Sequence, residues 1–182
     1  MLLDTIANAS GSSPAPAAPA LDPAVRIRPI RPSDIELERR FVYGLSARSR
    51  YLRLLSGRQL QPGELERWAN IDPRREIALV ALVGEDDDEE EVGFAQAIVE
   101  DIAEARWDFA IVIADAWQGH GLGRTLLGRL LDAARAAGVR IFSGITLAEN
   151  RGMVALARRL GFTVRREDGD ATLLRLELPL AR

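Results

Sequence analysis

The feature that most constrains this chain is a glycine-rich segment that directly follows an apolar run. From Asp108 to Leu127 the segment reads DFAIVIADAWQGHGLGRTLL. Phe109 to Ala114 predicts a buried strand, and Gly119, Gly121 and Gly123 alternate just before a run with helical spacing. A strand, a glycine loop and a helix in this order direct backbone N–H groups and the positive end of a helix dipole toward one point. The segment therefore predicts an anion site, and a phosphate is the anion that suits it best.

Two common phosphate-binding motifs do not match this segment. A P-loop requires Lys and then Ser or Thr after its last glycine, whereas Arg124 and Thr125 follow Gly123, and the chain contains no lysine. The dinucleotide fingerprint requires a glycine three residues after its second glycine, whereas this segment has Gly-x-Gly-x-Gly. It also requires an acidic residue on a second strand to hold a ribose, and none is placed for that. The segment does contain the pattern Gln-x-x-Gly-x-Gly, which begins at Gln118.

The rest of the chain alternates between strand and helix patterns. Ser33 and Glu36 form a capping-box pattern at the start of the first helix, and Gly138 and Gly161 are placed to end two later helices. The strands are predicted at residues 25–30, 76–83, 92–99, 106–115, 141–147, 162–166 and 172–178. The helices are predicted at residues 33–45, 45–55, 62–70, 122–138 and 150–160. This order predicts a mixed α/β (α+β) fold in which helices cover both faces of a sheet of about seven strands.

The run of acidic residues from Glu85 to Glu91 lies between two predicted strands. Such a run could bind a metal or a basic partner, but at the tip of a hairpin it is more often a solvated loop. We therefore assign the acidic run no role, and we predict no metal site.

Composition indicates one domain and a short tail. The chain has 182 residues, of which 47% are hydrophobic and 28% are charged, as is typical of a soluble domain with a sizeable core. Residues 1–24 are rich in Ala, Pro and Ser and lack periodicity, which predicts a disordered tail. The folded domain is expected at residues 25–182.

Composition also excludes several classes of function. No apolar run is long enough to cross a membrane, and the first residues do not form a secretory signal. The chain has no cysteine, which excludes disulfides and a thiol nucleophile, and its net charge of −3 argues against a nucleic-acid partner. We expect a cytoplasmic enzyme or binding protein. Because all 24 basic residues are arginine, the chain cannot acetylate a lysine side chain of its own.

Two motifs together resemble the GNAT family of acyl-CoA-dependent N-acetyltransferases. The first is the Gln-x-x-Gly-x-Gly pattern, and the second runs from Asn150, which opens a helix, to Gly161 and Phe162, which close it. The motifs have the order and spacing of the family, and the resemblance covers residues 25–178. Pat-type bacterial protein lysine acetyltransferases are the most similar members in residues 25–30, 45–53 and 147–150.

The resemblance implies where acetyl-CoA binds. The strands at 106–115 and 141–147 are expected to splay apart, with the pantetheine arm paired like an added strand to main chain at Ile111, Val112 and Ile113. Asn150 would reach the pantetheine amide, and it is also a suitable N-cap. His120 is expected to lie in solvent beside the phosphate rather than to act as a base. The pyrophosphate would be held by Gln118, Gly119, His120, Gly121, Leu122, Gly123 and Arg124.

Acetyl transfer to an amine requires a proton acceptor, because a lysine-like amine has a pKa of about 10.4. Pat-type enzymes place a glutamate on the strand before the glycine loop, and the matching residue here is Asp108. Aspartate is one methylene shorter, which limits its reach. Independently of the family, a carboxylate between Trp107 and Phe109 costs free energy unless it is hydrogen-bonded or faces a cleft, which favours a function. The alternative carboxylates are Glu100, Glu104 and Glu149.

The resemblance leaves three questions open. Many GNAT enzymes use a tyrosine of the second motif to protonate the departing thiolate, but the matching residue is Ala157, so the general acid is unassigned. The chain has two tyrosines, Tyr43 and Tyr51, and both lie in the predicted helices at residues 33–45 and 45–55 rather than in this motif. The favoured acceptor is a protein lysine, and the alternatives are a small amine or a catalytically degenerate domain that only binds acyl-CoA. A homodimer is one expected assembly.

Overall fold

The computed structural model describes residues 25–57, 61 and 63–180. The tail predicted at residues 1–24 lies outside the described residues. The strands are β1 Arg26–Pro29, β2 Glu76–Val83, β3 Glu90–Asp101, β4 Arg106–Ile113, β5 Ile141–Leu147, β6 Thr163–Glu167 and β7 Asp170–Pro179. The helices are α1 Ile35–Gly44, α2 Ala47–Leu54, α3 Glu64–Ala69, α4 Leu122–Ala136 and α5 Arg151–Arg159. None of these described helices has the length and apolarity needed to cross a membrane.

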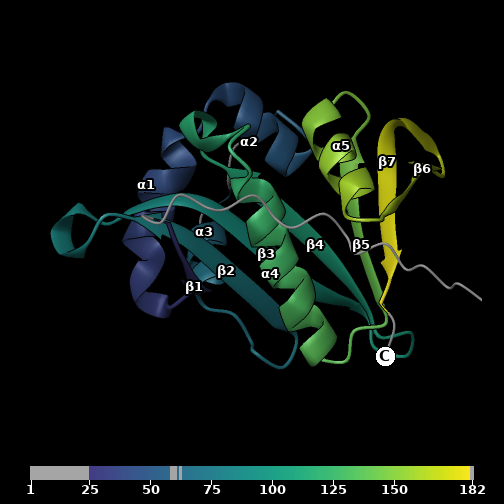
Figure 1. Cartoon of the computed structure of the whole chain (residues 1–182), viewed down its shortest axis with the longest axis horizontal. Helices are drawn as coiled ribbons and strands as arrows, with labels where there is room; N and C mark the ends of the chain where they lie inside the picture. Colours follow the sequence, from purple (N-terminus) through teal and green to yellow (C-terminus); the bar gives the residue numbers. More distant parts are fainter. Residues whose placement is uncertain (1–24, 58–60, 62, 181–182) are drawn as a thin grey trace, which may run out of the picture.

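The strands form one seven-stranded sheet in the order β1-β2-β3-β4-β5-β7-β6. Strands β2, β3 and β4 form an antiparallel meander, which β1 extends antiparallel to β2, whereas β4 and β5 are parallel. The pairing of β4 with β5 covers only Arg106–Asp108 and Ile141–Ser143, and both strands continue well beyond it. Figure 1 shows the two strands meeting near the C-terminus and diverging toward α2 and α5. The predicted mixed fold and splayed strands are confirmed.

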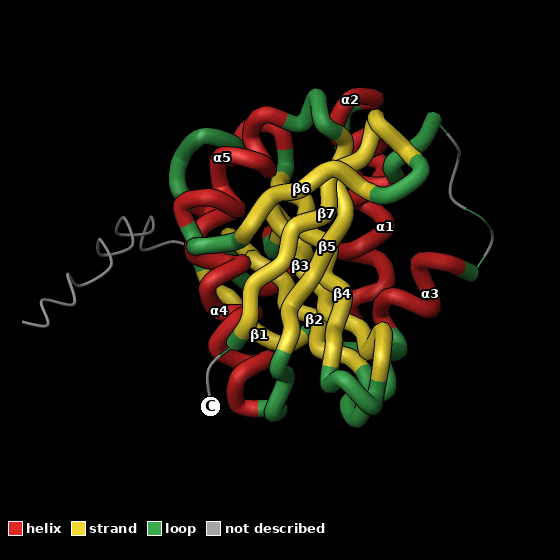
Figure 2. The backbone as a smooth tube through the Cα atoms, turned by 90° about the vertical axis from the view of Figure 1, so that its right-hand side faces the viewer, coloured by secondary structure: helices red, strands yellow, loops and turns green. Residues whose placement is uncertain are grey.

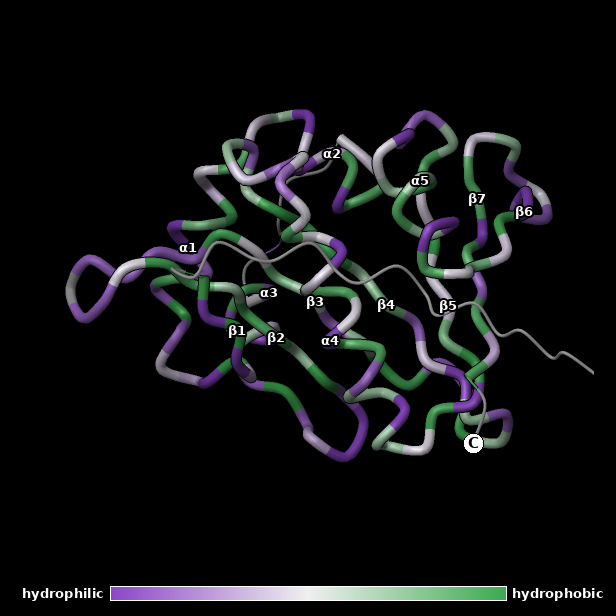
Figure 3. Tube along the Cα trace, viewed as in Figure 1, coloured by the Kyte–Doolittle hydropathy of each residue, from purple (hydrophilic) through white to green (hydrophobic). Residues whose placement is uncertain are grey.

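Helices cover both faces of the sheet, as predicted. Figure 2 shows α4 and α5 on one side and α1 and α3 on the other. One hydrophobic core packs α4 and α5 against the sheet and includes Leu126, Leu130 and Phe142, and a second packs α1 and α3 around Phe94. Figure 3 shows hydrophobic residues along the central strands and hydrophilic residues at the tip of the β2–β3 hairpin.

The start of the first helix differs from the prediction. Ser33 lies inside a short 3-10 helix, Pro32–Asp34, and the side chain that caps this turn is that of Asp34. Its carboxylate accepts a hydrogen bond from the Arg31 backbone N–H at 2.7 Å and two from the Arg28 guanidinium at 2.6 and 2.9 Å. A carboxylate that also pairs with β1 is a stronger acceptor than the Ser33 hydroxyl. The capping box predicted at Ser33 and Glu36 is therefore wrong.

The acidic run is not wholly a solvated loop. Its last two residues, Glu90 and Glu91, belong to β3, and Glu91 is 2% exposed. Glu89 forms an ion pair with Arg26 of β1 at 2.9 Å. A shift in the β2–β3 register between Ala81 and Leu82 accompanies the burial of Glu91. The prediction failed at this residue because a charge count along the chain does not show where the strand begins.

Candidate active site

The glycine loop has the backbone geometry that an anion site requires. Gly119 and Gly121 have φ values of 82° and 88°, in the left-handed region that favours glycine. Gly121 is also the N-cap of α4, a helix of 15 residues. The first N–H groups of a helix have no partners within the helix, so they are available to a ligand at its N-terminus.

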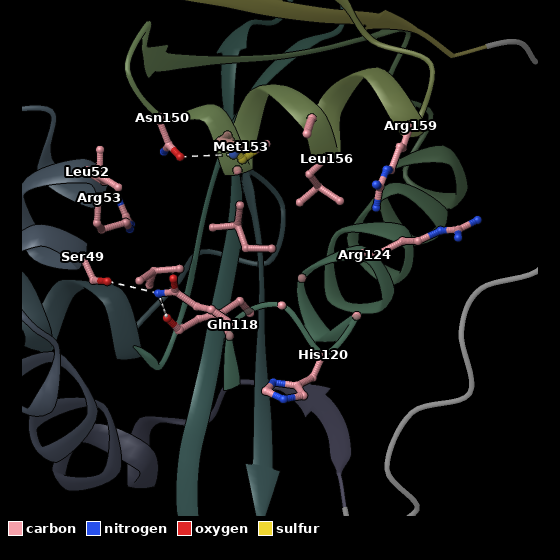
Figure 4. A pocket seen from close by; sticks show the side chains of 18 residues that line it. Ser49, Leu52, Arg53, Gln118, His120, Arg124, Asn150, Met153, Leu156 and Arg159 are labelled. Atoms are coloured by element: carbon pink, nitrogen blue, oxygen red, sulfur yellow. Dashed lines mark hydrogen bonds between the residues drawn. The ribbon is translucent and has the colours of Figure 1, made fainter. Parts of the chain in front are cut away.

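A cavity of about 730 Å³ lies between α2, the end of β4, the start of α4 and α5 (Figure 4). Every residue predicted to bind the cosubstrate lines this cavity except Leu122, whose side chain is 1% exposed and packs in the core. The cavity is also lined by residues that were not predicted to bind the cosubstrate, namely Ser49, Leu52, Arg53, Gly152, Met153, Ala155, Leu156 and Arg159. Three of these come from α2, in the segment that carries part of the Pat-type resemblance.

Hydrogen bonds tie the glycine loop to α2. The Gln118 side-chain amide donates to the Ile113 carbonyl at 3.0 Å and to the Ser49 hydroxyl at 3.1 Å, and Figure 4 shows both bonds. Asp115 accepts from the Ser46 backbone N–H at 2.9 Å and from the Ser46 and Ser49 hydroxyls at 2.7 and 2.8 Å. Burial raises the pKa of Asp115, but these hydrogen bonds outweigh burial and hold it below the ordinary value. The first turn of α2 is thereby fixed against the cavity.

Aromatic packing holds β4 and β5 together at the base of their splay. The rings of Phe109 and Phe142 stack with centroids 4.9 Å apart, and the Phe162 ring lies 5.4 Å from that of Phe109. A Cβ atom on Gly144 would lie 2.7 Å from the Phe109 ring, so only glycine fits at that position of β5. Past this cluster, β4 has no partner on the β5 side, and its main chain from Ile111 to Ile113 borders the cavity.

Asn150 and His120 lie on the cavity wall in different settings. The Asn150 side-chain oxygen accepts the Met153 backbone N–H at 3.1 Å, which confirms its predicted role as the N-cap of α5. That bond uses only the oxygen, so the amide nitrogen of Asn150 keeps both donor hydrogens for a ligand. His120, in the glycine loop, lines the cavity and is exposed to solvent.

Asp108 opens into a second cavity of about 310 Å³, on the face of β4 that α3 covers. Trp68, Gln96 and Ile98 line this cavity, and Arg53 borders it as well as the larger one. Burial raises the pKa of the half-buried Asp108 carboxyl to about 7, and the nearby negative charge of Glu100 adds to the rise. A carboxyl with this pKa can take a proton from an amine near neutral pH.

The alternative carboxylates are engaged elsewhere. Glu104 accepts from Arg106 at 3.1 Å, Glu149 pairs with Arg48 at 2.8 Å, and Glu100 accepts from the Ser143 hydroxyl at 3.1 Å. None of the three lines either cavity.

No side chain in the described part of the chain takes the place of the missing tyrosine. Ala157 is fully buried in the core, and neither Tyr43 nor Tyr51 lines the two cavities. A leaving thiolate would therefore take its proton from a source other than a tyrosine, such as solvent.

Comparison with known proteins agrees with the fold and the loop. The acetyltransferase (GNAT) family matches residues 45–162. An acetyltransferase of Pseudomonas aeruginosa is 38% identical over 151 residues, which are 81% of this chain and 80% of that protein. The chain therefore belongs to the GNAT acetyltransferase family, and acetyl-CoA is its cosubstrate.

The likeness to Pat-type enzymes is more modest. Acetyltransferase Pat of Mycolicibacterium smegmatis is 26% identical over 163 residues, which are 84% of this chain but 45% of that protein. The chain thus spans under half the length of that relative. The crystal structure of the GNAT domain of S. lividans PAT superposes with a TM-score of 0.77 at 25% identity and covers 86% of this chain and 90% of that one.

Proposed function

We propose that this acetyltransferase modifies the side-chain amine of a protein lysine, that Asp108 is its general base, and that the larger cavity holds acetyl-CoA. One observation carries the proposal: Asp108 opens into a cavity whose wall includes Arg53, and Arg53 also borders the larger cavity. An amine in the smaller cavity would lie next to the proton acceptor and on the border of the acyl-donor site.

The residues of the larger cavity suit coenzyme A. Its pyrophosphate would meet the loop from Gln118 to Arg124, where two glycines have left-handed φ values and the N-terminus of α4 begins. Its pantetheine arm would pair with the open edge of β4 from Ile111 to Ile113. The amide nitrogen of Asn150 is available to the arm from the α5 side.

Asp108 meets the chemical requirement of a base. The amine must lose a proton before its nitrogen can attack a thioester, and a carboxyl with a pKa near 7 is ionised above neutral pH yet still binds a proton well. The ammonium first gives one proton to Asp108, and the acetyl carbon then exchanges its bond to sulfur for a bond to nitrogen. The nitrogen loses its second proton to solvent as the intermediate collapses, and the thiolate takes a proton from solvent. A backbone N–H group near Ile111 or Val112 would donate to the oxygen on which charge develops.

The distance along β4 limits how the base reaches the amine. Asp108 and Ile111 are three residues apart, which is about 10 Å of strand. The shorter side chain of aspartate then favours a bridging water between the carboxylate and the amine.

The likeness to Pat supports a lysine acceptor. A lysine side chain also suits the smaller cavity, because the Trp68 ring and Ile98 offer apolar contact to its methylenes while Asp108 faces its amine. Four statements stay predictions: a tail at residues 1–24, a single domain at residues 25–182, a cytoplasmic location and a homodimer.

A small amine is the second candidate acceptor. The smaller cavity measures about 310 Å³, which is enough for a compact molecule, and Arg53 could pair with the carboxylate of an amino acid. A catalytically degenerate domain that only binds acyl-CoA is the remaining alternative, since the tyrosine acid is absent.

The acceptor can be tested by incubating the chain and acetyl-CoA with a panel of proteins, polyamines and amino acids. Because the chain has no lysine and no cysteine, acetyl-lysine arises only on the acceptor and every released thiol is coenzyme A. We expect release of coenzyme A together with acetyl-lysine on proteins. Turnover with small amines alone would exclude the lysine proposal, and binding of coenzyme A without turnover would exclude both enzymatic candidates.

A further inference from the structure

A bulge in β3 redirects the side chain of Glu100. In the pairing of β3 with β4, Val99 lies opposite Trp107 and Asp101 lies opposite Arg106, so Glu100 is an extra residue without a partner on β4. An extra residue of this kind bends the strand and re-aims its side chain. The Glu100 carboxylate accepts a hydrogen bond from Ser143 of β5. Since β4 lies between β3 and β5, this side chain crosses over β4.

The crossing point is beside Asp108. Ser143, which holds the end of the Glu100 side chain, is the β5 residue paired with Asp108. Ile98, two residues before Glu100, is the β3 residue paired with Asp108. The two carboxylates therefore project from adjacent places on the sheet, and the negative charge of Glu100 acts on Asp108.

Glu100 is held in place on two sides. Ser143 is fully buried, and its one hydroxyl hydrogen is shared between the Glu100 carboxylate at 3.1 Å and the Trp107 carbonyl at 3.3 Å. Arg175 of β7 lies 3.7 Å from the Glu100 carboxylate, but it makes two shorter bonds, both of 2.8 Å, to Glu167. Glu167 is therefore the closer partner of Arg175.

Charged groups of both signs face Asp108 from the surrounding elements. Glu100 of β3 disfavours its ionisation, whereas Arg175 of β7 and Arg53 of α2 favour it. Glu64 of α3 lines the same cavity. Among the described residues, Glu100 is the group whose negative charge raises the pKa of Asp108.

We propose that Glu100 is a positioning residue for acetyl transfer: the bulge and Ser143 hold its carboxylate beside Asp108, and its charge makes Asp108 a stronger proton acceptor. The inference rests on the proposed role of Asp108 as the base. It explains why the strand departs from regular pairing here, and it assigns a role to a carboxylate that lines neither cavity.

The test compares the pH dependence of kcat/KM for the acceptor in E100Q with that in the unchanged chain. Removing the charge is expected to move the midpoint of the rising limb to lower pH by about one. The plateau rate should fall roughly threefold, because a weaker base accepts the proton less readily. The matched control is D101N, which removes a carboxylate at the next residue of β3 and keeps an oxygen to accept the Glu104 N–H. D101N should leave the midpoint unchanged.

E100D separates charge from packing. It keeps the carboxylate, so its midpoint should lie closer to that of the unchanged chain than the midpoint of E100Q does. A midpoint that E100Q does not move would overturn the inference while leaving Asp108 as the base. Loss of activity at every pH in E100Q would make Glu100 itself the base and would overturn both proposals. Full activity in D108N would remove the proposed base regardless of what E100Q does.

Discussion

Two carboxyl pairs at opposite ends of β3 differ in what they face. At the end of β3, Glu100 lies beside Asp108, which opens into a cavity on the border of the larger cavity proposed to hold acetyl-CoA. At its start, Glu91 lies beside Glu38 of α1, and the two residues are 2% and 0% exposed. No hydrogen-bond donor in the described part of the chain reaches their four oxygens, and burial raises the pKa of both carboxyls. Glu91 borders a separate cavity that shares no lining residue with the other two.

The comparison shows that a raised pKa does not by itself identify a catalytic carboxyl. Burial raises the pKa of Glu38 and of Glu91 above the ordinary value, as it does that of Asp108. Of these three carboxyls, Asp108 is the one that lines the cavity bordered by Arg53, so under the proposed function it is the one placed to meet an amine. The pair at Glu38 and Glu91 affects stability instead. The following predictions test this division.

The largest effect is expected for Asp108→Asn. Removal of the base should lower kcat by a factor of about 10² to 10⁴, the usual contribution of general base catalysis. Folding should not weaken at pH 8, because a half-buried charge is removed. Steady-state kinetics together with thermal unfolding would check both parts. Unchanged kcat from pH 6 to 9 would show that Asp108 belongs with Glu38 as a structural carboxyl.

The pH dependence of kcat/KM in the unchanged chain should report the ionisation of Asp108. The carboxylate form is the base, so kcat/KM should rise with pH up to a midpoint near 7, the pKa of Asp108. Below the midpoint, activity should fall about tenfold for each pH unit, because only the ionised fraction accepts a proton. A profile that is flat from pH 5 to 8 would contradict this assignment.

Glu38→Gln should change stability without changing activity. Burial raises the folded-state pKa of Glu38 above the unfolded value of 4.5, so the folded protein holds a proton that the unfolded chain releases, and stability falls as pH rises from the unfolded pKa through the folded-state pKa. Removal of the charge should stabilise the chain at pH 8 by on the order of 2 kcal/mol and flatten this decline. Denaturant unfolding at pH 5 and pH 8 measures the effect.

The matched control for Glu38→Gln is Glu36→Gln on the same helix. The Glu36 side chain is 70% exposed, and it pairs only with Arg39 of the same turn at 3.4 Å. Its replacement should leave the pH dependence of stability unchanged. A fall in kcat in E38Q without a change in stability would contradict the division between the two carboxyl pairs.

The smallest effect is expected for Ser143→Ala. Loss of the hydroxyl lets Glu100 move away from Asp108, so the midpoint of kcat/KM should fall by roughly 0.3. The change has the same direction as in E100Q and a smaller size, because the charge is retained. A midpoint that moves to higher pH would show that Ser143 does not hold Glu100 in place.

Local patterns predicted most of the architecture. The strand at 76–83 and the strand at 141–147 begin and end at the residues expected, and Gly138 and Gly161 end α4 and α5. The predictions of a capping box at Ser33 and of a solvated Glu91 were wrong, because each outcome depends on a residue of another element. Arg28 of β1 is that partner for Asp34, and α1 covers Glu91.

The candidate site also has a part that local sequence patterns predicted and a part that they did not. The residues at the glycine loop and Asn150 were identifiable because a phosphate loop and an N-cap are built from neighbouring residues. The part played by α2 was not, because Ser46 and Ser49 reach Asp115 across more than sixty positions of sequence. The lining of the smaller cavity by Trp68 and Gln96 likewise follows from packing between elements far apart in the chain.

The sequence by itself therefore determined the family, the strand order of the meander and the loop that suits a phosphate, since all three depend on residue types at short, regular spacing. Only the tertiary structure decided which carboxyls lie beside one another, which of them lines a cavity bordered by Arg53 and where β3 bulges at Glu100. Burial and the distance to other charges set the behaviour of a carboxyl, and both depend on segments that meet only in the folded chain.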